Sequence, residues 1–189
     1  MIKLNAKQLR TTLADPEAAK SFPRNDIFII MDNVLDTYNV GSIFRLADAV
    51  AAKKIYLCGD TLTPPNTRIK KASVNTWGWV EWKYLPLATN AISEIRSEFP
   101  TTQVIAVEQD KRSCPFQTAG YKLPVAVIVG NETNGISREA LDESDLIVEL
   151  PMWGVNKSLN VMVSCGIVLY EIMKSGTAFK YKGTYGQTG

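Results

Sequence analysis

Short runs of β-branched and aromatic residues recur along the chain, and stretches of helical or turn character separate them. Six of these runs have the length and composition of β-strands: residues 27–31, 55–58, 80–82, 104–107, 125–129 and 146–150. Strands that alternate with helices form sheets that are largely parallel and covered on both faces. The pattern therefore predicts an α/β fold, with a central strand where residues 125–129 are continuously apolar.

The segment between the first two runs has the periodicity of a helix with one buried face. Its apolar residues follow the i, i+3, i+4, i+7 spacing of such a helix: Ile43, Leu46, Ala47 and Val50. We expect residues 36–41 to form a loop before this helix. Arg45 lies on the side opposite Ile43, so it can point outward while its neighbours anchor the helix.

The end of the chain contains an irregular segment followed by a long apolar run. Pro151 and Gly154 interrupt the end of a strand, and Ser158 and Asn160 then stand where a helix must begin. The first amides of a helix lack partners within the helix, and short polar side chains gather beside them. This arrangement is typical of a ligand site.

The length and composition favour one soluble globular domain. We assign residues 1–25 to an N-terminal extension that Pro16 interrupts, 26–174 to the domain, and 175–189 to a flexible basic and aromatic tail. A second domain helix is expected at residues 88–99. The longest apolar run is too short to cross a bilayer and no signal core is present, so we expect no membrane association and a cytoplasmic location.

The chain contains no histidine, which excludes Ser-His-Asp and Cys-His catalysis and every histidine metal site. Cys58, Cys114 and Cys165 are too scattered for a disulfide framework or a regular metal cluster, so we expect buried or incidental thiols and no metal. The chemistry must therefore use arginine, lysine, carboxylates, hydroxyls or a bound cofactor.

The net charge of +2 neither requires nor excludes nucleic acid, but the basic residues are unevenly distributed. One cluster comprises Arg68, Lys70 and Lys71, and the tail carries Lys180 and Lys182 among aromatic residues. Basic and aromatic mixtures suit phosphate contacts and base stacking. These five residues are candidate RNA contacts, although a solvated basic surface is an equally ordinary interpretation.

Three polar loops each follow a predicted strand. They are Asn39-x-Gly41-Ser42-x-x-Arg45, residues 130–136 with the sequence Gly-Asn-Glu-Thr-Asn-Gly-Ile, and the segment from Leu150 through Ser158-Leu159-Asn160. In open α/β sheets, ligands bind where loops gather at the carboxyl ends of the strands. Each loop alone could be an ordinary turn, helix cap or solvated charge. Together, and in this order, they predict one site.

These motifs resemble those of the SpoU, or TrmH-like, class of the SPOUT RNA methyltransferases. The resemblance covers residues 28–173, and residues 107–109, Val-Glu-Gln, also resemble the cofactor-side loop of that family. It implies S-adenosylmethionine as methyl donor, RNA as substrate and a homodimer packed partly through the last helix. It also implies a C-terminal deep trefoil knot, which general rules of chain topology would not suggest.

The resemblance also implies roles for individual residues. Arg45 would accept the proton of a ribose 2′-hydroxyl or activate it electrostatically, and Asn39 would orient the ribose or Arg45. Glu132 would position the substrate or pair with the arginine, and Ser158 and Asn160 would form hydrogen bonds around the site. Cofactor neighbours would be Val107, Gly130, Leu150, Ser158 and Leu159. Gly130 suits this role because a missing side chain lets a ligand approach the backbone.

Two other functions stay open from the sequence. One is a catalytically silent RNA-binding or assembly protein on the same scaffold, and the other is an RNA methyltransferase that acts on a base nitrogen. The sequence leaves transfer RNA and ribosomal RNA as alternative substrates. Trp77, Trp79 and Trp82 could stack on bases, although their alternation is more simply explained by a strand face or a dimer contact.

Overall fold

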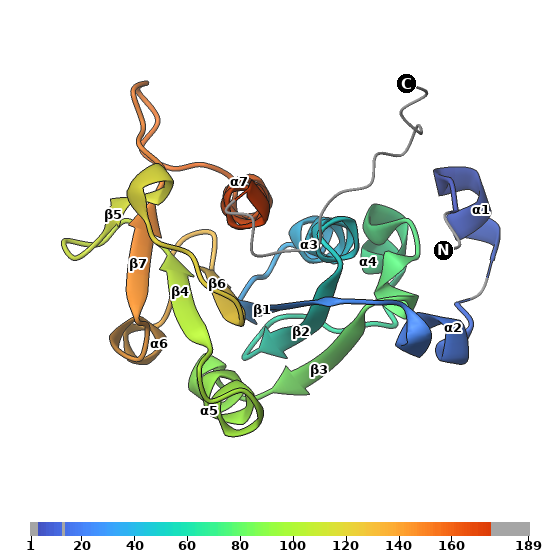
Figure 1. Cartoon of the computed structure of the whole chain (residues 1–189). Helices are drawn as coiled ribbons and strands as arrows, with labels where there is room; N and C mark the ends of the chain where they lie inside the picture. The colour runs from blue at the N-terminus through green and yellow to red at the C-terminus, as the bar shows by residue number, and fades with distance from the viewer. Residues whose placement is uncertain (1–3, 13, 175–189) are drawn as a thin grey trace, which may run out of the picture.

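A computed structural model describes residues 4–12 and 14–174, and these form a sheet with helices on both sides (Figure 1). The strands are β1 (Asn25–Asp32), β2 (Ala52–Cys58), β3 (Glu81–Leu85), β4 (Gln103–Val107), β5 (Cys114–Pro115), β6 (Val125–Gly130) and β7 (Leu146–Glu149). The α-helices are α1 (Ala6–Thr11), α2 (Pro16–Ser21), α3 (Thr37–Ala49), α4 (Thr67–Ser73), α5 (Ala88–Glu98), α6 (Arg138–Asp142) and α7 (Val161–Lys174). Two short 3-10 helices are η1 (Thr76–Gly78) and η2 (Phe116–Thr118).

The strands form one sheet in the order β3-β2-β1-β6-β4-β7-β5, and all neighbouring strands are parallel. The continuous apolar strand β6 lies between β1 and β4 and is buried along its whole length. All six predicted strands are present, and the α/β prediction is confirmed. The two-residue strand β5 was not predicted, because so short a segment carries no periodicity.

Alternating side chains of β1 divide the core into two parts. Ile27, Ile29 and Met31 pack with α3, α4 and α7 on one face of the sheet. Phe28 and Ile30 pack with α5 and α6 on the other. Because both faces are covered, every position of a central strand can be apolar. The two helical layers are visible on opposite sides of the strands in Figure 1.

Helix α3 begins earlier than the sequence pattern indicated. The carboxylate of Asp36 accepts a hydrogen bond from the amide of Tyr38 at 2.8 Å, so Asp36 caps a helix that starts at Thr37. The prediction of a loop at residues 36–41 was therefore wrong. Asn39 and Gly41 lie on the first turns of α3, where Asn39 is buried and only 5% exposed.

Gly41 is explained by a helix contact rather than by a turn. A β-carbon at this position would lie 2.6 Å from the Cβ atom of Ala72 and 2.7 Å from the carbonyl oxygen of Ile69, both on α4. The missing side chain therefore allows α3 and α4 to pack closely. Helix α4 itself was not predicted, since Ile69 is its one large buried apolar residue.

The N-terminal extension contains two short helices. Asn5 caps α1 by accepting hydrogen bonds from the amides of Lys7 and Gln8, both at 3.0 Å. Pro16 occupies the start of α2, where a missing N–H group costs nothing, so it separates the two helices as the sequence suggested. The predicted tail, residues 175–189, lies outside the described residues.

The three tryptophans of residues 77–82 do not share a strand face. Trp77 lies in η1, Trp79 follows it, and Trp82 lies in β3. All three are half-buried, and Trp77 and Trp82 pack against the core. The strand-face interpretation was wrong for Trp77 and Trp79, and their burial favours a packing role over base stacking.

Candidate functional site

A cavity of about 410 Å³ opens at the carboxyl ends of β4, β6 and β7. Small-molecule sites of this size are common, and this edge of a parallel sheet is where they form. Apolar side chains supply part of its wall, including those of Val107, Val129, Val148, Leu150 and Leu159. Polar groups also line it, including those of Glu108, Gln109, Asn131, Asn156 and Ser158.

Every residue predicted to contact a cofactor lines this cavity. Val107 ends β4, Gly130 ends β6, Leu150 follows β7, and Ser158 and Leu159 precede α7. These residues are distant in the sequence and meet because parallel strands β4, β6 and β7 are close neighbours in the sheet. The mixed apolar and polar wall suits a nucleoside with an amino-acid group, so the residues present fit S-adenosylmethionine.

Gly130 is required for a reason other than the predicted one. A β-carbon there would lie 2.3 Å from the carbonyl carbon of Gly135 and 2.4 Å from the amide nitrogen of Ile136. The loop after β6 folds back on itself, since Asn131 and Gly135 exchange backbone hydrogen bonds of 2.9 and 3.0 Å. The missing side chain therefore makes room for this returning backbone, although Gly130 also borders the cavity.

A chain of side-chain hydrogen bonds joins three of the predicted catalytic residues. The amide nitrogen of Asn160 donates to the side-chain oxygen of Asn39 at 3.1 Å. The amide nitrogen of Asn39 donates in turn to Glu132 Oε1 at 2.9 Å. These bonds connect the start of α7, the first turns of α3 and the loop after β6. Glu132 and Asn160 also line the cavity.

Glu132 is held as an ion by its surroundings. Its carboxylate accepts hydrogen bonds from the backbone amides of Leu35 and Asp36, both at 3.1 Å, beside the start of α3. Burial favours the neutral acid, but the hydrogen bonds from Asn39, Leu35 and Asp36 outweigh it and lower the pKa of Glu132. A carboxylate with a lowered pKa is a weak base, so this arrangement suits positioning rather than proton transfer.

The helix α7 begins one residue after Asn160. The side-chain oxygen of Asn160 accepts hydrogen bonds from the amides of Met162 at 3.0 Å and Val163 at 3.4 Å, which makes Asn160 the cap. Ser158 lies before the helix, where its amide donates to the side chain of Asn156 at 3.2 Å. The alternative that Ser158 is the helix cap is therefore wrong.

Arg45 is separated from the other predicted catalytic residues. It lies on α3 six residues after Asn39, which corresponds to about 9 Å along the helix axis. Its side chain is exposed and is not part of the cavity wall. Within the described residues it forms neither an ion pair nor a hydrogen bond. The structure therefore brings together Asn39, Glu132, Ser158 and Asn160, and it leaves Arg45 on the neighbouring surface.

Several cavity residues were not among the predicted site residues. Gln109, Asn131, Met152 and Asn156 all line the cavity. Asn131 also shapes the loop, because its side-chain oxygen accepts hydrogen bonds from the amides of Thr133 and Asn134, both at 2.9 Å. The sequence signal for Asn131 and Gln109 was present, since both stand within motifs that had been recognised. Met152 and Asn156 also stand within the third recognised segment, residues 150–160, but neither was singled out as a site residue.

The predicted basic contacts lie partly within the described chain. Arg68, Lys70 and Lys71 are exposed on α4, whereas Lys180 and Lys182 lie outside the described residues. Cys58 and Cys165 are buried, and burial raises the pKa of both thiols to about 12. The prediction of buried thiols is confirmed for these two cysteines.

In residues 4–12 and 14–174, no group of three or more cysteine and carboxylate side chains is placed to hold a metal ion. None of the helices in this part of the chain has the length and apolar character needed to cross a membrane.

Comparison with known proteins identifies relatives for most of the chain. A tRNA (guanosine(18)-2′-O)-methyltransferase of Aquifex aeolicus is 31% identical over 156 residues, which cover 80% of this chain and 70% of that protein. The enzyme with the same name in Escherichia coli K12 is 28% identical over 152 residues, or 79% of this chain and 63% of that protein. The chain thus spans less than two thirds of the second relative.

Solved structures agree with the sequence comparison. An AdoMet-bound rRNA methyltransferase from Sinorhizobium meliloti superposes with a TM-score of 0.72 at 27% identity, covering 82% of this chain and 59% of that chain. The sequence profile of the SpoU rRNA methylase family matches residues 26–170. Because this match and the Aquifex relative both cover most of the chain, the protein belongs to the SpoU rRNA methylase family.

Proposed function

We propose that the chain transfers the methyl group of S-adenosylmethionine to a ribose 2′-hydroxyl of RNA. The observation that carries the proposal is the convergence of the loops after β4, β6 and β7 on one cavity, whose wall contains every residue expected to hold the cofactor. The relatives named for 2′-O-methylation and the AdoMet-bound rRNA methyltransferase support the same activity.

Different residues of the cavity wall would contact different parts of the cofactor. The side chains of Val107, Leu150 and Leu159 would pack against the adenine. Polar groups of the cofactor would contact Glu108, Asn156 and Ser158. When bound, S-adenosylmethionine supplies a methyl group on a positively charged sulfur. The chain's part is to align the ribose oxygen with that methyl group and to stabilise the oxygen as its proton leaves.

Asn39, Glu132 and Asn160 act together as a positioning unit. Because Glu132 is ionised and accepts three hydrogen bonds, from Asn39, Leu35 and Asp36, it fixes Asn39 and the start of α3. Asn160 fixes the start of α7 against the same asparagine. The unit therefore fixes the position of the cavity wall relative to α3, the helix that carries Arg45.

Arg45 is the charged group that acts on the ribose. Arginine stays protonated at neutral pH, so a guanidinium near the 2′-hydroxyl would favour the developing oxyanion and lower the cost of proton loss. Arg45 could act as a base only if bound RNA completed the surroundings that its deprotonation requires. The electrostatic role needs no such change and is the one we favour.

The homodimer is part of the proposal. Helix α7 exposes Val163 (37%) and Tyr170 (57%), which is unusual for a helix of such apolar composition. Leu46 of α3 packs beside Gly166 of α7, so a second copy on α7 would also approach the exposed face of α3. Light scattering should give the mass of a dimer, and Tyr170→Glu should shift it to the monomer. A wild-type protein that is monomeric at micromolar concentration would contradict the proposed dimer.

Transfer RNA and ribosomal RNA are both candidate substrates, and the proposal includes a cytoplasmic location for the reaction. The experiment is to incubate the chain with labelled S-adenosylmethionine and either total transfer RNA or ribosomal RNA, then digest and identify the product. A 2′-O-methylated nucleoside is expected. Label on a base nitrogen would favour the alternative methyltransferase. Absence of both transfer and cofactor binding would favour a silent RNA-binding protein.

A further inference from the structure

Helix α1 is fastened to the main body next to the end of α4. The side-chain amide of Asn75 donates to the carbonyl oxygens of Leu9 at 2.8 Å and Arg10 at 3.2 Å. These are carbonyls of the last turn of α1, which lack partners within the helix. Farther along, Ala14 packs against Gly78, where a β-carbon would lie 3.0 Å from the Ala14 Cβ atom.

The same asparagine also contacts α4. The backbone amide of Asn75 donates to the carbonyl oxygen of Lys70 at 3.3 Å. Asn75 has a φ of +66°, a left-handed conformation that lets its backbone close α4 while its side chain reaches α1. The backbone carbonyls of Arg10 and Lys70 therefore both accept hydrogen bonds from Asn75, which links the end of α1 to the end of α4.

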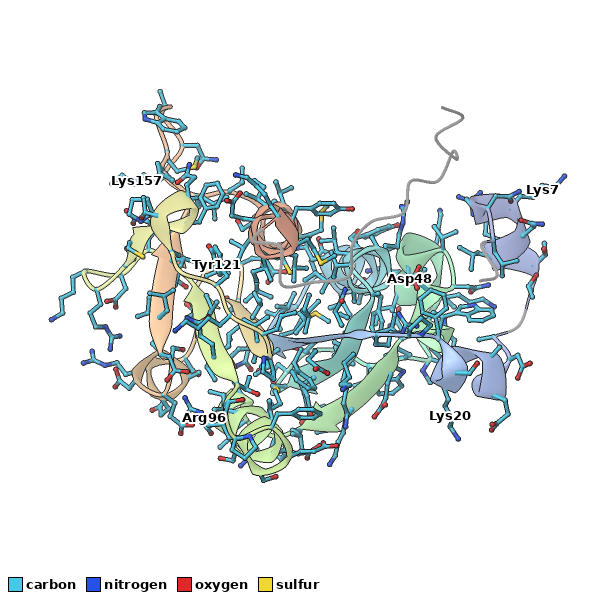
Figure 2. The ribbon with its side chains drawn as sticks, viewed as in Figure 1. Lys7, Lys20, Asp48, Arg96, Tyr121 and Lys157 are labelled. Atoms are coloured by element: carbon cyan, nitrogen blue, oxygen red, sulfur yellow. The ribbon has the colours of Figure 1, made fainter. Side chains whose placement is uncertain are left out.

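This contact joins two groups of exposed cations into one surface. We define the α1–α4 surface by its five exposed basic residues: Lys7, Arg10, Arg68, Lys70 and Lys71. Figure 2 shows Lys7 pointing outward from α1. Neither residues 4–14 nor residues 61–80 contain an aspartate or glutamate. Positive charge on this surface is therefore not balanced by acids of its own segments.

Several other cations of the described chain are neutralised locally. Lys54, Arg96 and Arg112 form ion pairs with nearby carboxylates. The five residues of the α1–α4 surface form no ion pair with any described residue. A net charge of only +2 is thus compatible with a strongly positive potential at this one place.

The α1–α4 surface borders the helix of Arg45. Gly41 lets α4 pack closely against α3, and Arg45 follows Gly41 by one helical turn on the same side of α3. Exposed positive charge thus extends from Lys7 across α4 toward Arg45. Large apolar side chains, which insertion into a lipid surface requires, are not exposed on α1 or α4.

We propose that α1 and α4 form a single RNA-binding surface that holds phosphates of the substrate and leads its backbone toward Arg45. The inference rests on the proposed function and adds the N-terminal helix to the substrate site. Phosphates spaced along a strand match cations spread over two helices, because each contact releases counterions and contributes to affinity without reading a base.

The test compares two matched pairs of substitutions in the whole chain. Lys7→Gln with Arg10→Gln removes two charges from α1, and Lys122→Gln with Arg138→Gln removes two exposed charges elsewhere. Affinity for unfractionated transfer RNA is measured by fluorescence anisotropy at several KCl concentrations, and S-adenosylmethionine affinity by calorimetry. For the α1 pair, the slope of log affinity against log salt should fall by about two, with cofactor affinity unchanged. The control pair should retain the wild-type slope.

A third variant tests whether RNA binding depends on the attachment of α1 to the rest of the protein, and it leaves the net charge unchanged. Asn75→Gly keeps a residue suited to the left-handed conformation and removes the side-chain amide. It should weaken RNA binding several-fold while leaving the cofactor affinity unchanged.

Four outcomes would overturn the inference. They are an unchanged salt slope in the α1 pair, an equal loss in the control pair, wild-type RNA affinity in Asn75→Gly, and equally tight charge-dependent binding to anionic phospholipid vesicles. If the wild-type protein methylates no RNA, the proposed function fails first. If it methylates RNA and the α1 pair binds normally, the α1–α4 surface alone is wrong.

Discussion

The side-chain amide of Gln109 donates a hydrogen bond of 2.6 Å to the carbonyl oxygen of Lys157. Gln109 follows β4, and Lys157 lies in the irregular segment between β7 and α7. Among the described residues, this is the one hydrogen bond that joins residues 151–159 to another part of the chain. Most of the segment is exposed, with Trp153 at 88% and Val155 at 103% of their reference areas. Gln109 therefore holds one wall of the cavity in place.

Replacement of Gln109 by methionine keeps the size of the side chain and removes its donor. A hydrogen bond of this kind contributes about 1 kcal/mol, so we expect the dissociation constant of S-adenosylmethionine to rise about five- to tenfold. Calorimetry measures this change. Trypsin cleavage after Lys157, followed by mass spectrometry, should be faster in the variant because the segment is no longer tethered.

Gln117 provides the control, since it is an exposed glutamine in η2 and does not line the cavity. Gln117→Met should leave both the cofactor affinity and the cleavage rate unchanged. Wild-type values for both measurements in Gln109→Met would show that the bond does not position the cavity wall.

Alanine at Gly41 should destabilise the protein even though alanine is the better helix former. Its methyl group would meet Ala72 and the carbonyl of Ile69 at 2.6 and 2.7 Å, so α3 and α4 must separate. Overpacking of this kind costs about 1–3 kcal/mol and exceeds the gain in helix propensity of about 1 kcal/mol. Urea denaturation measures the free energy of unfolding. Gly120→Ala is the control, since an added β-carbon at Gly120 meets nothing within 4 Å. A wild-type free energy of unfolding in Gly41→Ala would contradict the packing argument.

The strands of this fold could be predicted because each is a short apolar run, and burial on both faces leaves such runs unbroken. Helix α3 shows where that approach ends. Its first turns contain Asn39 and Gly41, which favour turns in isolation. They are helical here because Asp36 caps the helix and α4 requires a residue without a side chain at Gly41. Such requirements arise from tertiary contacts and leave no periodic trace.

The candidate site was predictable for a different reason. Motif order identified residues that meet at the cavity, among them Leu150, Gly130 and Glu132. The roles of these residues depend on distances that a sequence does not contain. Gly130 was expected to admit a ligand, yet it admits the backbone of Gly135. Arg45 could be placed on the outer face of its helix, but its separation from the cavity could not be foreseen.

Stability should depend on the ionised form of Glu132. Its pKa is lowered in the folded protein from an ordinary value of 4.5, so its contribution is fully present above that value and is lost as the pH falls through the folded pKa. We expect Glu132→Gln to reduce the free energy of unfolding by about 1 kcal/mol at pH 7, because a carboxamide cannot accept at both positions. The difference from wild type should shrink below pH 4.5.

Chemical denaturation of both proteins between pH 3 and 7, about the range over which carboxylates titrate, measures this difference. Glu139→Gln on α6 is the control, since Glu139 is exposed. A wild-type advantage that stays constant across the whole range would show that the charge of Glu132 contributes nothing to the fold.

Arg45→Ala should abolish methyl transfer and leave S-adenosylmethionine affinity nearly unchanged, because Arg45 is exposed and lies outside the cavity wall. Loss of one charged group that stabilises an oxyanion lowers rates by about 10²–10³-fold. Arg45→Lys separates the two chemical roles, since lysine keeps the positive charge. An electrostatic role predicts partial recovery with an unaltered pH profile, whereas a base role predicts a profile displaced toward the pKa of lysine. Tritium transfer from labelled cofactor gives the rates, and undiminished transfer by Arg45→Ala would remove Arg45 from the reaction.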